Sequence, residues 1–293
     1  MTQYNNNLSV LPFYDSLDKQ NHRKTYAYGE IYPLFCPIGR ILPFQFMTEH
    51  RATNNIVGVL LKDMQGNTVA TITTQLTEGG LTKTAYTDDG YDIFSYPDIM
   101  PFNINLNEGR YYLQIRVSAG VFYSEVFTVV ADISPYLKVE WEMNNDLIAD
   151  GWRIQYSTGA YHFVNRLYLN TQLGKPEYVF EENGENRDGY FFAEKMISEK
   201  TYKFNFLAPE YLCDVLRFVR MADGIRITDR YGRVYLADTF LITPKWQEQG
   251  DLASVDAEFT TDTVAKAIGS GILPSARGDF NNDYNDDYDI TNE

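Results

Sequence analysis

The chain of 293 residues contains little of what marks several protein classes. Its two cysteines, Cys36 and Cys213, are too few and too far apart for a disulfide framework or a zinc site. Its three histidines, His22, His50 and His162, show no metal-ligand spacing. No apolar run approaches the ~20 residues that cross a bilayer, and the first residues lack the basic and apolar regions of a secretory signal. We therefore expect a soluble protein without a metal or a cofactor, and without membrane insertion.

Positive charge is also scarce. Lys and Arg number 25 against 40 Asp and Glu, a net charge of −15, which argues against a nucleic-acid partner because such binding depends on clustered cations. Apolar residues make up 44%, enough for an ordinary globular core. Tyr (23) and Phe (18) dominate the aromatic residues. Both favour strands, and Tyr is common at protein interfaces.

Catalytic motifs are missing as well. The chain has no nucleophile elbow, phosphate loop or dinucleotide fingerprint, and its Ser, Cys and His residues form no triad pattern. Asp279–Asn285 resembles part of a calcium loop, but Tyr284 replaces the required Gly and Ile290 the required Glu. The tripeptide Arg277–Asp279 matches an integrin-type motif that is too short to be specific. Sequence spacing does not reveal the paired carboxylates of a glycosidase, so a hydrolase stays open as an alternative. We expect a protein that is not an enzyme.

Short strands separated by turns fill the first part of the chain. Gly58–Lys62 and Thr68–Thr74 flank a turn at Gly66 and predict a hairpin. Arg110–Val117 and Val121–Val130 alternate as two further strands. The Gly-Arg-Tyr-Tyr-Leu stretch that begins at residue 109 resembles the penultimate strand of immunoglobulin-like modules, here without their Cys…Trp…Cys pattern. The prediction is an N-terminal Ig-like β-sandwich domain over residues 1–133, which includes an irregular N-terminal arm to about residue 28.

A boundary at Ala131–Pro135 introduces a second β-rich domain, residues 134–271. Its one helix is expected at about 209–223: Pro209 suits a first helical residue, Leu212 and Leu216 lie on an apolar stripe, and Gly224 suits a C-terminal cap. Glu181–Gly189 reads as an exposed loop. Strands are predicted at residues 137–141, 161–169, 201–206, 225–228, 233–242 and 253–260. This order predicts a second sandwich or barrel with one flanking helix.

The last 22 residues, 272–293, form an acidic tail. Six acidic residues stand against Arg277, a net charge of −5, with few aliphatic side chains. A segment of this composition does not fold alone. We expect the chain to fold to about Gly271 and the tail to order only against a partner.

One loop between predicted strands stands out as an assembly interface. Trp246 is a large aromatic residue among polar neighbours, and such a residue is often an anchor for a partner. Trp141, Trp152 and Trp246 could also form a sugar-stacking platform, although core or interface packing is the simpler interpretation. The predicted interface comprises Lys245, Trp246, Gln247, Glu248, Gln249 and Asp251.

Two resemblances bear on function. The stretch Arg166–Gly269 includes Gly174–Tyr178, Asp188–Phe192 and Leu241–Trp246. It resembles virion structural proteins of tailed bacteriophages that infect Bacteroidetes, including crAss-like phages, and Tyr28–Val130 is similar to the N-terminal part of the same proteins, so that this resemblance covers most of the chain. Separately, the order of elements over Thr201–Thr260 is similar to that of tail-tube and distal-tail proteins.

The resemblances imply a non-enzymatic virion component that assembles into a tail, neck or baseplate-type ring or hub. Its expected partners are other virion proteins and copies of itself, and its expected location is the virion, after synthesis in the host cytoplasm. The alternative is a carbohydrate-binding or host-surface adhesion module, for which a host glycan would be the partner. Copy number, ring symmetry and position along the virion do not follow from the residues.

Overall fold

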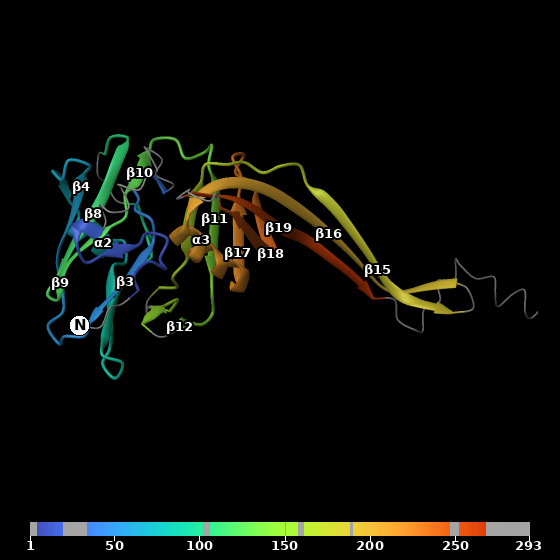
Figure 1. The fold of residues 1–293 in the computed structure, drawn as a ribbon, viewed down its shortest axis with the longest axis horizontal. Helices are drawn as coiled ribbons and strands as arrows, with labels where there is room; N and C mark the ends of the chain where they lie inside the picture. The colour runs from blue at the N-terminus through green and yellow to red at the C-terminus, as the bar shows by residue number, and fades with distance from the viewer. Residues whose placement is uncertain are drawn as a thin grey trace, which may run out of the picture. The chain divides into compact units, whose positions relative to one another are not determined.

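A computed structural model describes residues 5–19, 34–101, 106–149, 151–157, 161–187, 190–246 and 252–267. The described chain is mainly β, as Figure 1 shows, which confirms the predicted fold class. The chain divides into two compact units, one with residues 1–175 and 202–261 and the other with residues 176–201 and 262–293. The boundary predicted near residue 133 stays a prediction.

The N-terminal strands form two sheets. One sheet has β8 at its centre, with β9 and β10 along one edge, β4 along the other and β5 beyond β4. At its far edge β1 pairs antiparallel with β9, and β2 runs parallel to β10. The second sheet has the order β3-β7-β6. The strands are β1 (Phe13–Tyr14), β2 (Phe35–Pro37), β3 (Phe44–Glu49), β4 (Ile56–Asp63), β5 (Thr68–Thr71), β6 (Thr82–Tyr86), β7 (Tyr91–Tyr96), β8 (Gly109–Val117), β9 (Gly120–Ser124) and β10 (Phe127–Val130).

Aromatic rings from both sheets fill the space between them. Phe46 on β3 lies 5.0 Å from Phe94 of the neighbouring strand β7 and 5.0 Å from Phe122 of the facing sheet, measured between ring centroids. Phe13 of the N-terminal arm lies 4.9 Å from both Phe44 and Phe46. Part of the arm is therefore core rather than irregular coil, because Val10, Leu11 and Phe13 are buried.

Strand β8 carries a mark of Ig-like sandwiches. The Tyr111 hydroxyl donates to the carbonyl oxygen of Asn107, four residues upstream, at 3.0 Å. This is the arrangement of a tyrosine corner at the start of the penultimate strand. Leu113, two residues further on and fully buried, stands where antibody domains have their second cysteine. The strand order and this corner make the sandwich Ig-like.

Two local predictions in the sandwich were wrong. Val121–Val130 is not one strand, because Ser124 accepts the N–H of Leu113 on its side chain and the Glu125 carboxylate accepts the N–H of Val126, which breaks the ladder between β9 and β10. The second strand of the predicted hairpin ends at Thr71, and helix α2 (Thr73–Glu78) follows it. The turn at Gly66, with φ of 85°, is confirmed.

The later strands form a seven-stranded sheet of order β14-β11-β17-β18-β19-β16-β15 and a small hairpin, β12-β13. The predicted hairpin around residues 229–232 is confirmed as β17-β18. The strands are β11 (Leu137–Glu142), β12 (Leu147–Ala149), β13 (Trp152–Ile154), β14 (Asn165–Leu169), β15 (Glu177–Arg187), β16 (Tyr190–Pro209), β17 (Gly224–Thr228), β18 (Val234–Lys245) and β19 (Leu252–Ala267).

The predicted helix exists, with tighter bounds. Helix α3 (Glu210–Leu216) continues as a 3-10 turn, η1 (Arg217–Met221). Leu212 and Leu216 are buried, which confirms the apolar stripe. Pro209 is the N-cap rather than the first helical residue. Gly224 does not cap the helix but begins β17, where a Cβ would lie 2.9 Å from the Glu142 carboxylate.

The prediction of an exposed loop at Glu181–Gly189 was wrong for residues 181–187, which the structure describes. Residues up to Arg187 belong to β15, which pairs with β16 from Glu177↔Thr201 to Arg187↔Tyr190. The loop was predicted because these residues are polar and show no alternation of apolar side chains. Strands whose two faces are both solvated need no such alternation to form their hydrogen-bond ladder. The tail, 272–293, lies outside the described residues.

Candidate assembly surfaces

The unit formed by residues 176–201 and 262–293 exposes aromatic side chains. Tyr178 is 76% exposed and Phe180 is 61% exposed. Because side chains alternate along a strand, both lie on one face of β15, opposite Lys200 and Ser198 of β16. β15 is also the edge strand of its sheet. A sheet edge that presents apolar side chains is a template for another chain.

The predicted interface lies at the end of β18. Trp246 follows the strand and is 48% exposed, while Lys245, its last residue, is exposed and forms an ion pair with Asp256. The other predicted residues, Gln247, Glu248, Gln249 and Asp251, lie outside the described residues. Trp141 is buried in the core, and Trp152 packs on Phe218 with ring centroids 5.6 Å apart. Core packing therefore accounts for Trp141 and Trp152.

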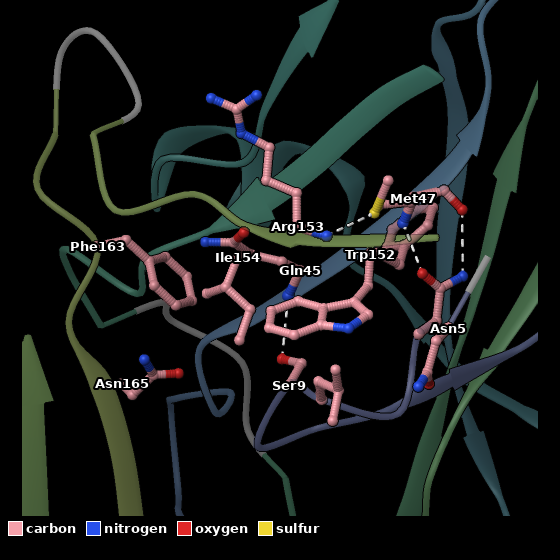
Figure 2. Close-up of a pocket in the computed structure, with 12 residues that line it drawn as sticks. Asn5, Ser9, Gln45, Met47, Trp152, Arg153, Ile154, Phe163 and Asn165 are labelled. Carbon is pink, nitrogen blue, oxygen red and sulfur yellow. Dashed lines mark hydrogen bonds between the residues drawn. The ribbon is translucent and has the colours of Figure 1, made fainter. Parts of the chain in front are cut away.

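A small pocket lies where the N-terminal arm, β3 and β13 meet (Figure 2). Its polar groups bond to one another: the N–H of Gln45 donates to Ser9 Oγ at 3.1 Å, and the N–H of Met47 donates to Asn6 Oδ1 at 2.8 Å. The N–H of Arg153 points at the Met47 sulfur. The first two contacts join the arm to β3, the third joins β3 to β13, and together they indicate a structural junction.

A second part of this junction holds buried charges. Asp98, almost fully buried, accepts bonds from Arg40 at 2.9 Å and from Arg166 at 2.6 Å. Arg166 also donates to Glu140, which pairs with Lys138 at 2.9 Å. Burial raises the pKa of Glu140, but the bonds from Lys138 and Arg166 outweigh it, so that the pKa lies below its usual value. The arrangement holds β11 and β14 against the sandwich.

Two kinds of feature are absent from the part of the chain that the structure describes. There, no three His, Cys, Asp or Glu side chains gather as metal ligands. No helix among those residues has the length and apolar character needed to cross a membrane.

Comparison with known proteins identifies no family. No family model matches the chain, and no curated protein is similar to it. A solved structure that it matches is described as "Crystal structure of Dpr2 Ig1-Ig2 in complex with DIP-Theta Ig1-Ig3", with 8% identity over 83% of this chain and 90% of that chain and a TM-score of 0.14. A TM-score this low carries no argument about this chain.

The exposure of the aromatic residues of β15 was not predicted from the sequence. Tyr178 entered only as part of a stretch that carries the family resemblance, and no role was predicted for Phe180. The sequence did contain a signal, because Tyr178, Val179 and Phe180 are a strand-forming run directly before Glu181 and Glu182. The polar residues from Glu181 onward led instead to the prediction of a loop.

Proposed function

We propose that the protein is a non-enzymatic structural component of a phage virion, which assembles through protein–protein contacts. The assignment to a virion is based on the resemblance described above. The observation that carries the assembly role is the exposure of Tyr178 and Phe180 on one face of a paired ribbon. β15 is an edge strand, so one side of its backbone and these two rings are open to a partner. A partner that covers both would stabilise this edge of the sheet.

Trp246 supplies a second anchor in this proposal. Large aromatic residues that fill a partner's pocket contribute most of the binding energy of many interfaces. Its half-exposed position at the end of β18 suits this role. Lys245, already paired with Asp256, would lie at the polar rim with the neighbouring residues of the predicted loop. The proposed partners are other virion proteins and copies of the same chain in a tail, neck or baseplate-type ring or hub.

Incorporation of variants into particles tests the proposal. Tyr178→Ser/Phe180→Ser removes the exposed rings of β15, and Trp246→Ala removes the second anchor. The matched control, Val57→Ser/Ile148→Ser, removes two equally exposed apolar side chains elsewhere. We expect the first two variants to fold but to be depleted from particles at least tenfold, and the control to be incorporated normally. Normal incorporation of all three, together with specific binding to a glycan array, would instead favour an adhesion module.

A further inference from the structure

The turn between β17 and β18 presents cations in a fixed geometry. Asp229 is buried, and its Oδ1 accepts the N–H groups of Tyr231 at 2.9 Å and Arg233 at 3.0 Å. Its other oxygen, Oδ2, accepts Nε of Arg233 at 2.7 Å. These bonds hold residues 229–233, here called the arginine turn, in one conformation.

The arginine turn combines positive charge with apolar surface. Tyr231 is 67% exposed, and the guanidinium carbons of Arg230 and Arg233 lie 4.6 and 5.3 Å from its ring centroid. The strand that follows adds Val234 and Leu236, which are 56% and 70% exposed. On a chain of net charge −15, such a surface suits an acidic segment that also carries aromatic rings.

The acidic tail has that composition, in a regular pattern. An aspartate followed by an aromatic residue occurs three times at intervals of four: Asp279-Phe280, Asp283-Tyr284 and Asp287-Tyr288. In an extended segment, residues four apart lie on the same side, about 13 Å from one another. The rings would therefore line one side of the tail, and each has a carboxylate next to it. Carboxylates pair with guanidinium groups, and rings pack on Tyr, Val and Leu side chains.

We propose that the acidic tail of one copy of the chain docks on the arginine turn of a second copy. This inference rests on the proposed self-assembly. The tail and the turn are different surfaces, so the contact is heterologous, the kind that closes rings or continues into filaments. The 26 residues that follow Ala267 can span up to about 90 Å when extended, which allows them to reach a neighbouring copy. Attraction between tail and turn would offset the repulsion between copies that each carry a charge of −15.

A binding measurement tests the docking surface. A fluorescein-labelled peptide of residues 277–293 is titrated into the full-length protein and followed by anisotropy. We expect saturable binding that weakens at least tenfold in Arg230→Glu/Tyr231→Ser, a variant that keeps the Asp229–Arg233 contacts. The control Arg217→Glu/Met221→Ser makes the same change of charge and also removes an exposed apolar side chain, both on η1, and should change affinity less than twofold. Equal affinity for both variants, or no binding to the wild type, would overturn the proposal.

Hydrogen exchange on the wild-type protein gives a second readout that does not depend on a variant's folding. Peptide binding should slow exchange of the amides of residues 229–236. A peptide with Phe280, Tyr284 and Tyr288 all changed to Ser should have no such effect. Protection elsewhere on the chain, with none at the arginine turn, would contradict the assignment of this surface.

A mixing experiment shows whether the contact joins two copies. One full-length variant carries Arg230→Glu/Tyr231→Ser, and the other carries Phe280→Ser/Tyr284→Ser/Tyr288→Ser. We expect the mixture to form larger species than either variant forms alone, because only in the mixture does one intact turn meet one intact tail. A mixture that sediments like the separate variants would refute docking between copies. These measurements use purified protein only, so their failure is distinct from failure to find the protein in virions.

Discussion

Arg153 on β13 contacts both Asp146, which directly precedes β12, and Tyr86 of the Ig-like sandwich, and its removal tests how much these contacts stabilise the fold. Its Nε and Nη2 donate to Asp146 Oδ2 at 2.9 and 2.7 Å, and its guanidinium carbon lies 4.0 Å from the centroid of the Tyr86 ring. The change Arg153→Met keeps most of the side chain's length and apolar stem but removes the charge and the donors. Asp146 would keep its bond from the N–H of Tyr156 at 2.9 Å.

The expected loss can be worked from these contacts. Charge-assisted hydrogen bonds contribute about 1.5–3 kcal/mol, and a cation–π contact adds at least about 0.5–1 kcal/mol, the range for exposed contacts. We take the two bonds to one oxygen as a single contribution and predict that Arg153→Met lowers the free energy of unfolding by about 2–4 kcal/mol. Arg153→Lys should lose roughly half as much, because it keeps the charge but not the planar fork.

Urea denaturation of the full chain, followed by circular dichroism, measures these differences. The control is Arg116→Met on β8, an exposed arginine whose loss should change stability by less than about 0.5 kcal/mol. If Arg153→Met destabilises no more than this control, the contacts of Arg153 do not stabilise the fold.

Three further predictions concern the core, the sandwich and pH. Leu216→Ala should destabilise the protein by about 2–5 kcal/mol in denaturant unfolding, since Leu216 is buried in α3; a loss under about 0.5 kcal/mol would contradict its place in the core. Tyr111→Phe should cost about 0.5–1.5 kcal/mol by removing the bond to Asn107, and no loss would mean that this bond does not stabilise the sandwich. Because folding lowers the pKa of Glu140, its charge stabilises the fold at pH values above the pKa that this carboxyl has in the unfolded chain, about 4.3. This stabilisation is lost as the pH falls through the lower pKa that Glu140 has in the folded protein. Glu140→Gln should therefore be less stable than the wild type at pH 6, with the difference shrinking below about pH 4; a difference that does not vary with pH would refute this.

Local patterns predicted the elements that depend on local chemistry. The apolar stripe through Leu212 and Leu216 located the helix, and Gly66 located a turn. The residues around Tyr111 resembled an Ig-like strand, and the corner hydrogen bond explains why: it needs only a tyrosine and a backbone carbonyl four residues away.

Elements that depend on distant partners were not predictable in this way. β15 forms because β16 pairs with it over its whole length, which the polar residues Glu181 and Glu182 do not reveal. The break at Ser124 depends on the N–H of Leu113 on another strand. Of the surfaces considered for assembly, Trp246 was visible as an unusual residue, whereas the common face of Tyr178 and Phe180 became apparent only with the register of the ribbon.

Mass spectrometry and cryo-EM of purified virions test the central claim, assembly into a phage particle, most directly. We predict that the protein is present in stoichiometric amounts and that its density lies in a ring or hub, with Tyr178, Phe180 and Trp246 buried against neighbouring subunits. Absence of the protein from purified particles, or density in which all three side chains face solvent, would contradict the account.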